Sequence, residues 1–407
     1  MDSMALRLVQ AGRTSDLEEV PRLIADAGRA VGLDDVRIYI VDLRQRVLRE
    51  LTGAGPNAGE GGTDLPVDGS LPGRAFQLTA SLSTAEAGGR LWVPILDGTE
   101  RLGVLRADAR GPAANERIQT TEDLASLAAV LLVSKRSQSD SYARLRRTAP
   151  MTTAAELQWN LIPPLSFANS RVVVSAAMEP AHDVGGDAFD YAVAADRLHL
   201  AVFDAMGHDS FAGLTANLAV AACRNQRRNG ADLPTTAAGA ERVLVEHFGD
   251  SRYVTAVLAE LNMATGLLAW TNHGHPPPML IRGGRWTTTL HCPPSHPLGT
   301  ALGLPVQVCH EQLEPGDRLL LYSDGVTDAV DRAGRRFGLD QFAAFIARRH
   351  ADELPVPETL RRLIATIIEH HDGTLTDDAT ILFTEWNGPA RNIHLRPQEG
   401  RHQPADG

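Results

Sequence analysis

The stretch that decides the fold is Asp183-Val184-Gly185-Gly186-Asp187-Ala188-Phe189-Asp190. Three further acidic clusters follow it, centred on Asp204, on Asp324 and on the pair Asp377-Asp378, and each lies at the edge of an apolar, strand-like run. Any one cluster is also typical of a turn. Two like charges about 4 Å apart repel by roughly 1 kcal/mol in water and by about 4 kcal/mol at an effective dielectric of 20. Converging carboxylates without a basic partner therefore predict a site for hard cations such as Mg²⁺ or Mn²⁺.

A series of motifs extends this pattern along the second half of the chain. In chain order they are Gly185-Gly186-Asp187-Ala188-Phe189-Asp190, Phe203-Asp204-Ala205-Met206-Gly207-His208, Asn272-His273-Gly274-His275-Pro276-Pro277-Pro278, Pro297-Leu298-Gly299, Gly316-Asp317-Arg318-Leu319-Leu320-Leu321-Tyr322-Ser323-Asp324-Gly325-Val326-Thr327-Asp328 and Asp377-Asp378-Ala379-Thr380. Their order and spacing resemble the bacterial PPM-type (PP2C-like) serine/threonine phosphatases of the SpoIIE/RsbU group, over roughly residues 151–386. The resemblance implies an α+β fold, an αββα sandwich in which two packed antiparallel sheets are flanked by helices.

The resemblance also implies a site and a chemistry. Two divalent ions, Mn²⁺ or Mg²⁺, would share a water that attacks the phosphorus of a phosphoserine or phosphothreonine. Carried over by position, Asp204 is the bridging ligand, the carbonyl of Ala205 is a second contact, and Asp190 caps or orients the loop. The metal ligands implied in this way are Asp187, Asp204, Ala205, Asp324, Asp377 and Asp378, and the catalytic set is Asp187, Asp204, Asp324 and Asp377. Asp378 is expected mainly to support Asp377.

The chain departs from the family pattern at several positions. Asp209 stands where glycine is common, and His273 stands where alanine is common. Met206 occupies the position at which eukaryotic relatives carry a general-acid histidine, and His208 lies nearby at a different spacing. His275, in the proline-rich turn, is expected to be structural.

Composition limits the class of protein. The chain has 407 residues, enough for two domains and a linker, and 43% of them are hydrophobic. The formal net charge of -11 argues against nucleic acid or an anionic membrane as the main partner, since both favour basic surfaces. Three cysteines, an odd number in a long chain, predict no disulfide scaffold. Because the sequence shows no signal-peptide plan and no apolar run of ~20 residues, a cytoplasmic location is expected.

The first part of the chain resembles a GAF-type α/β sensory domain in its order of helix, strands, short helix, strands and helix, beginning with helical spacing over residues 17–31. No His or Cys precedes His182, which excludes haem ligation, bilin attachment and metal sites that use these residue types. Two interpretations stay open: an apolar pocket for a small organic ligand, and a ligand-free docking and dimerisation module. The expected domain order is a flexible N-terminus (1–13), the GAF-like domain (14–135), a helical linker (136–152), the phosphatase domain (153–386) and a disordered tail (387–407).

The connector between the two domains has its own pattern. Leu124, Leu127 and Leu131 form one stripe at helical spacing, which predicts that the connector pairs with its copy in a homodimer. A passive spacer is the alternative. The segment from Thr153 to Glu156 is typical of a capping box that begins the first helix of the phosphatase domain.

The leading functional hypothesis is a metal-dependent protein serine/threonine phosphatase regulated through the GAF-like domain. By resemblance, its substrate is a phosphorylated STAS-type anti-sigma-factor antagonist in a partner-switching pathway. One alternative is a scaffold protein with a degenerate phosphatase fold, which the presence of all the key carboxylates argues against. The other is a sensor-coupled hydrolase of small phosphate esters.

Overall fold

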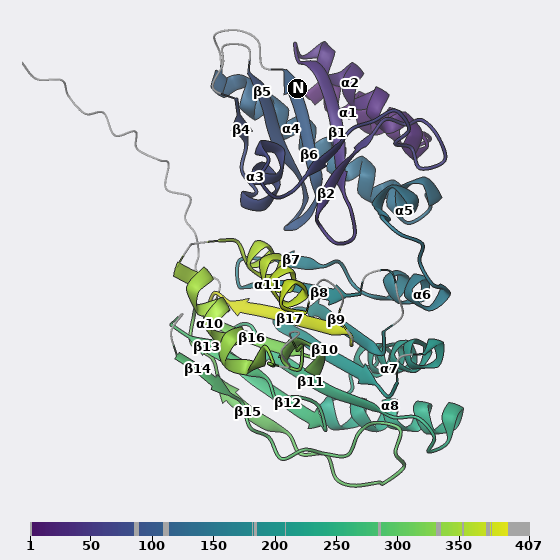
Figure 1. Cartoon of the computed structure of the whole chain (residues 1–407), viewed down its shortest axis with the longest axis vertical. Helices are drawn as coiled ribbons and strands as arrows, with labels where there is room; N and C mark the ends of the chain where they lie inside the picture. Colours follow the sequence, from purple (N-terminus) through teal and green to yellow (C-terminus); the bar gives the residue numbers. More distant parts are fainter. Residues whose placement is uncertain are drawn as a thin grey trace, which may run out of the picture.

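The chain folds into two bodies joined by short helices (Figure 1). This computed structural model describes residues 2–84, 89–108, 114–180, 182, 185–207, 209–283, 286–330, 335–351, 354–371, 375 and 377–389. The sequence predictions for Asp183, for His208 and for the tail beyond residue 389 lie outside the described residues. Within these ranges, no helix is long and apolar enough to cross a membrane.

The N-terminal body is one antiparallel sheet, in the order β3-β2-β1-β6-β5-β4, with helices on both faces. Its elements are α1 (Asp2–Gly12), a 3-10 turn (Leu17–Glu19), α2 (Val20–Ala30), β1 (Asp34–Val41), β2 (Val47–Leu51), β3 (Asp64–Pro66), α3 (Leu71–Leu78), β4 (Leu82–Ser83), β5 (Arg90–Asp97), β6 (Glu100–Asp108) and α4 (Ala114–Arg136). α1, α2 and α4 cover one face through a core that includes Leu8, Ile24 and Leu132. α3 covers the other face, where Phe76 and Trp92 are buried. This α/β layout fits the predicted sensory domain, and its assignment as a GAF domain stays a prediction.

Two details of the N-terminal body differ from the sequence predictions. The N-terminus, predicted to be flexible, contains α1, and its Leu8 is only 5% exposed in the sheet-facing core. Leu124 and Leu131 are buried in that same core, and Leu127 packs against it. The predicted dimer seam through these leucines is therefore wrong, because helical spacing marks an apolar stripe but not the surface that the stripe covers.

The connector is helical, as predicted, but it is divided. α5 (Asp140–Arg146) packs Leu145 into the N-terminal core, and α6 (Thr153–Leu161) begins the C-terminal body. The hydroxyl of Thr152 accepts a hydrogen bond from the backbone N–H of Ala155, at 3.3 Å, so Thr152 caps α6. The predicted capping box starting at Thr153 was wrong by one residue, and Glu156 instead forms an ion pair with Arg147.

The C-terminal body is the predicted α+β sandwich of two antiparallel sheets. One sheet has the order β15-β12-β11-β10-β9 and the other β14-β13-β16-β17-β8-β7. The strands are β7 (Ser166–Ala168), β8 (Val172–Glu179), β9 (Asp187–Ala194), β10 (Arg197–Ala205), β11 (Val254–Asn262), β12 (Leu267–His273), β13 (Met279–Arg282), β14 (Trp286–Thr289), β15 (Cys309–Gln312), β16 (Asp317–Tyr322) and β17 (Ala379–Trp386). The helices after α6 are α7 (Ser210–Arg228), α8 (Leu233–Phe248), α9 (Asp324–Thr327), α10 (Gly338–Ala351) and α11 (Val356–His370).

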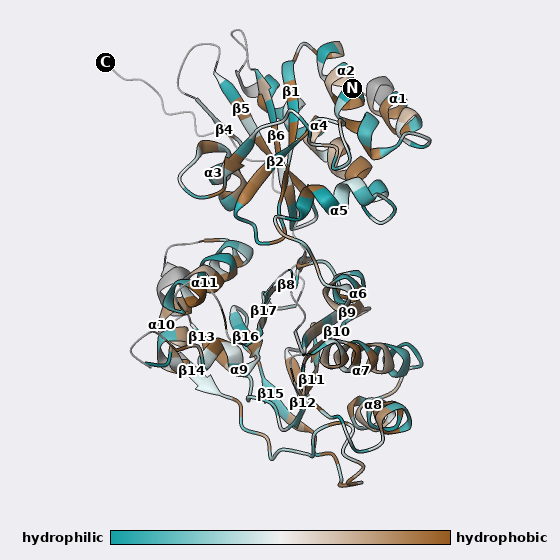
Figure 2. Ribbon diagram, turned by 45° about the vertical axis from the view of Figure 1, so that its right-hand side comes forward, coloured by the Kyte–Doolittle hydropathy of each residue, from teal (hydrophilic) through white to brown (hydrophobic). Residues whose placement is uncertain are grey.

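Three apolar layers hold the sandwich together. The largest lies between the sheets and includes Val202, Val257 and Leu382. A second joins α7 and α8 to the five-stranded sheet, and a third joins α10 and α11 to the six-stranded sheet. In Figure 2 brown, apolar stretches run along strands, whereas teal, hydrophilic stretches lie on α5 and on outer helix turns. Alternate residues of a strand belong to different layers: Leu319 and Leu321 of β16 face the other sheet, whereas Leu320 and Tyr322 face the helices.

Charged side chains join the two bodies. Arg101 on β6 donates to Glu358 on α11, at 3.1 Å, and the two side chains are only 2% and 0% exposed. Arg361, also on α11, binds both Glu358 (2.9 Å) and Asp68 in the N-terminal body (2.6 Å). The N-terminal body therefore contacts the C-terminal body directly as well as through the connector.

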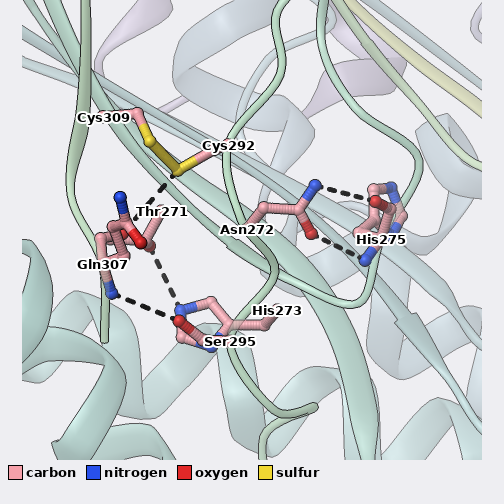
Figure 3. The surroundings of a disulfide bond; sticks show 8 residues. All are labelled: Thr271, Asn272, His273, His275, Cys292, Ser295, Gln307 and Cys309. Atoms are coloured by element: carbon pink, nitrogen blue, oxygen red, sulfur yellow. Dashed lines mark hydrogen bonds between the residues drawn. A yellow bond between two sulfur atoms is a disulfide. The ribbon is translucent and has the colours of Figure 1, made fainter. Parts of the chain in front are cut away.

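A disulfide joins Cys292 to Cys309 across 17 positions of sequence (Figure 3). It ties the long segment after β14 to the edge strand β15, while Cys223 is a free, buried thiol. The composition predicted no disulfide scaffold. One local bond does not make such a scaffold, but counting cysteines gave no sign of this pair, because the meeting of residues 292 and 309 depends on the path of the intervening loop.

Candidate metal centre

Asp187 and Asp204 lie directly opposite each other in the β9–β10 ladder, and Thr255 of β11 lies opposite Asp204 on its other side. Directly opposed residues of an antiparallel pair share a face, with Cβ atoms about 4.5–5.5 Å apart. Phe189 and Val202, each two positions away along its strand, belong to the core between the sheets. The row of Asp187, Asp204 and Thr255 therefore points toward the opposite sheet, at one end of that core.

The six-stranded sheet supplies the other carboxylates. Asp324 begins α9 immediately after β16, and Asp377-Asp378 precedes β17. Ser323 joins the two strand ends: its backbone N–H donates to the carbonyl of Thr380 at 3.0 Å, and its Oγ accepts from the N–H of Thr380 at 2.9 Å. These bonds bring Asp324 and Asp378 to the same end of the sandwich as Asp204.

The carboxylates raise one another's pKa values. Burial first, and then the charges of Asp324, Asp377 and Asp378, raise the pKa of Asp204 to about 7. Burial, followed by Asp204 and Asp378, raises the pKa of Asp187 well above its ordinary value. Burial and then Asp377 raise the pKa of Asp324 in the same direction. Like charges held together in this way favour either a bound proton or a bound cation.

Glycines allow the backbone to close around these groups. A Cβ on Gly186 would lie 2.4 Å from the carbonyl oxygen of Ala205, and one on Gly185 would lie 2.0 Å from Oδ2 of Asp378. A Cβ on Gly325 would lie 1.9 Å from the carbonyl oxygen of Asp378. Close approach to a backbone carbonyl thus requires glycine at Gly186 and Gly325. The carbonyl of Ala205 lies beside the carboxylates of Asp187, Asp204, Asp324, Asp377 and Asp378, which we call the carboxylate row.

The donor set fits a hard divalent cation. All the groups are oxygens, and Oδ2 of Asp187, a residue only 2% exposed, has no hydrogen-bond partner among the described residues. The hydroxyls of Ser323 and Thr380 lower the pKa of Asp187, but burial and the neighbouring carboxylates outweigh them. Over the described residues, no three His, Cys, Asp or Glu side chains are close enough together to hold an ion between them. The carboxylates face one another without forming a closed ligand shell.

Other residues from the sequence analysis have structural contacts. Asp190 binds Arg224 and Arg227 of α7, each at 2.7 Å, so the prediction that it orients the loop was wrong. Its side chain points to the helix face because it is three positions from Asp187 on the strand. Asp209 caps α7 through the N–H of Ala212 at 2.9 Å and pairs with an arginine at 3.1 Å. The side chain of Met206 is 39% exposed and has no proton to donate.

Sequence reasoning missed the contact of Gln158 with the site, and it predicted a structural role for His275 without indicating its partners. Gln158 of α6 is 2% exposed and donates to the backbone carbonyl of Asp187, which fixes the start of β9. Its place in the run Leu157-Gln158-Trp159-Asn160-Leu161-Ile162-Pro163-Pro164, directly after the predicted start of this helix, was a signal that could have found it. His275 binds Thr255 and the carbonyl of Tyr322, and no local pattern indicated this contact between sheets.

Comparison with known protein families gives a match within the C-terminal body. Residues 194–387 match the family model described as stage II sporulation protein E (SpoIIE). The matched range includes every candidate ligand except Asp187, and it does not extend into the N-terminal body.

Several solved structures resemble the chain. One contains the RsbU and RsbW domains of a Mycobacterium tuberculosis protein, with 23% identity, coverage of 56% of this chain and 64% of the other, and a TM-score of 0.49. Another contains the PP2C phosphatase domain and a regulatory fragment of SpoIIE from Bacillus subtilis, with 20% identity, coverage of 53% and 62%, and a TM-score of 0.44. A third is the SiaA-PP2C domain of Pseudomonas aeruginosa, with 22% identity, coverage of 57% and 94%, and a TM-score of 0.49. The chain spans less than two thirds of the first two structures, and since every TM-score is below 0.5 the assignment rests on the family model.

Proposed function

We propose that the chain is a metal-dependent phosphatase that removes phosphate from serine or threonine of a protein, because residues 194–387 match the SpoIIE family model. The observation that carries the proposal is the row of mutually coupled carboxylates, in which the pKa of Asp204 is raised to about 7, by burial first and then by three neighbouring aspartates. Such uncompensated charge is costly in a protein that does not bind a cation.

The proposed cofactor is a pair of Mn²⁺ or Mg²⁺ ions. When bound, such ions lower the pKa of a coordinated water and stabilise negative charge on a phosphoryl group. The residues that would hold them are Asp187, Asp204, Asp324, Asp377, Asp378 and the carbonyl of Ala205. Asp204 is central among them, because its pKa responds to three of the other carboxylates. Ser323 and Gln158 position the backbone that carries this set.

The proposed substrate is a phosphorylated STAS-type anti-sigma-factor antagonist in a partner-switching pathway, and the family match supports it. Regulation through the N-terminal body is proposed on the buried contact of Arg101 with Glu358. α11, which carries Glu358, packs on β8 and β17, and β17 begins directly after Asp378. A shift of the N-terminal body could therefore reach the carboxylate row through one helix and one strand.

The test is phosphate release from a phosphorylated STAS-domain protein by the full-length chain, with and without Mn²⁺, alongside Asp204→Asn. Metal-dependent release that the variant loses is the expected result. Release only from p-nitrophenyl phosphate would support the small-ester hydrolase instead. Failure to release phosphate from either substrate, with no Mn²⁺ binding by calorimetry, would support the scaffold.

A further inference from the structure

His275 lies in the turn that follows β12 and is only 4% exposed. Its Nδ1 is 2.8 Å from Oγ1 of Thr255, and its Nε2 is 3.0 Å from the backbone carbonyl oxygen of Tyr322. Thr255 belongs to the five-stranded sheet and Tyr322 to the six-stranded sheet. One imidazole therefore connects the two sheets through the core of the sandwich.

The partners fix the tautomer of this ring. A carbonyl oxygen can only accept, so Nε2 of His275 carries the hydrogen that is donated to Tyr322. Nδ1 is then the acceptor and takes the hydrogen of the Thr255 hydroxyl. Burial lowers the pKa of His275 to about 4, which keeps the ring neutral and suited to both bonds near pH 7. The turn is also held in place, because Asn272 exchanges two hydrogen bonds of 2.9 Å with the backbone of His275 (Figure 3).

Both partners of His275 are next to candidate metal ligands. Thr255 is directly opposite Asp204 in the β10–β11 ladder and shares its face of the sheet. Tyr322 is the last residue of β16, two positions before Asp324. The ring of His275 and its two hydrogen bonds therefore join the neighbour of the Asp204 strand to the strand that leads into Asp324.

We propose that His275 is a positioning residue that holds Asp204 and Asp324 at the separation needed to bind divalent ions. This inference rests on the proposed function and deepens it. Groups that orient metal ligands without touching the metal typically change metal affinity about 10- to 100-fold when they are removed.

The chain contains a matched control two residues away. His273 is fully buried, and burial lowers its pKa to about 4 as well. It also binds a threonine hydroxyl and a backbone carbonyl, those of Thr271 and His296, each at 3.1 Å. Thr271 lies on the same strand as His273, however, and His296 belongs to the loop beside α8, so these bonds do not join the two sheets.

The experiment measures the Kd of Mn²⁺ by calorimetry, and the melting temperature, for full-length His275→Leu, His273→Leu, Thr255→Val, Thr271→Val and Thr255→Ser. Both leucine variants are expected to lower the melting temperature. Mn²⁺ affinity is expected to fall about 10-fold or more in His275→Leu and Thr255→Val, and to stay within about twofold of wild type in His273→Leu, Thr271→Val and Thr255→Ser.

Equal Mn²⁺ affinity in Thr255→Val and Thr271→Val would overturn the inference, because a purely structural role predicts no difference between them. If His275→Leu does not fold, the threonine pair decides the question, since valine keeps the shape of threonine. If the wild-type chain binds Mn²⁺ and releases phosphate, and His275→Leu and Thr255→Val keep its Mn²⁺ affinity, only the role of His275 is refuted. A wild-type chain that binds no Mn²⁺ refutes the proposed function and this inference together.

Discussion

Glu358 and Asp187 are both buried carboxylates, but their neighbours have opposite charge. Burial raises the pKa of Glu358, but Arg361, Arg101 and Arg362 outweigh it and bring the pKa below its ordinary value. Around Asp187, burial and two further aspartates act in the same direction and raise the pKa. The first carboxylate is compensated inside the chain. The second is not, and it lies at the end of the sandwich where a ligand would supply the missing positive charge.

This contrast distinguishes a structural charge cluster from the proposed metal site. A buried ion pair holds two bodies together, and removing one partner leaves the other uncompensated. A group of like charges is destabilising until a cation binds, so removing one member relieves repulsion but abolishes function. The two clusters should therefore respond to the same kind of substitution, carboxylate to amide, with opposite effects on stability.

The largest effect is expected for Glu358→Gln. Arg101 would remain buried with its charge uncompensated, and such losses typically cost about 3–5 kcal/mol. Denaturant unfolding of the full-length chain measures the effect, with separate probes for each body because two bodies need not unfold together. Glu19→Gln is the control, since Glu19 pairs with Arg22 on the surface, where such pairs contribute about 0–1 kcal/mol. An equal, small effect of both substitutions would contradict the interface.

A smaller effect in energy, but a large one in rate, is expected for Asp204→Asn. The amide keeps the shape of the side chain but holds a hard cation poorly, so Mn²⁺-dependent phosphate release should fall by at least about 100-fold. The metal-free melting temperature should not fall, because repulsion with Asp324, Asp377 and Asp378 is relieved. The same outcome is expected for Asp324→Asn. Near wild-type rates at saturating Mn²⁺ would remove that residue from the metal site.

Metal binding should stabilise the wild-type chain through mass action. At a free Mn²⁺ concentration ten times the Kd, the free energy of unfolding should rise by about 1.4 kcal/mol. The increase should shrink in Asp187→Asn and persist in Glu358→Gln, since only the first substitution alters the carboxylate row. Thermal melts of metal-stripped protein with added Mn²⁺ measure it. An equal increase in both variants would place the bound ion elsewhere.

The sequence indicated the carboxylates but not their supports. Asp187 and Asp204 could be predicted because each lies at a strand edge within an acidic, glycine-rich motif, and such motifs are local. The bond from His275 to Tyr322 joins positions 47 apart, and that from Arg101 to Glu358 joins positions 257 apart. Contacts of this kind depend on how the sheets pack and on how the two bodies meet. No local periodicity encodes them.

The smallest effect is expected at the rim of the interface, where Asp68 pairs with Arg361 at 2.6 Å but its side chain is 69% exposed. The hydrogen bond from Arg361 is the main reason that the pKa of Asp68 lies below its ordinary value of 3.8. A lowered folded-state pKa means that the stabilisation is present above pH 3.8 and is lost as the pH falls through the folded-state value. Solvent screening limits it to less than about 1 kcal/mol, and added salt should reduce it further. Urea unfolding of wild type and Asp68→Asn should therefore differ slightly at pH 7, and the two should converge only as the pH falls from 3.8 through the folded-state pKa. A difference that grows on acidification would show that the pKa of Asp68 is raised in the folded state, and that its pairing with Arg361 does not stabilise the interface.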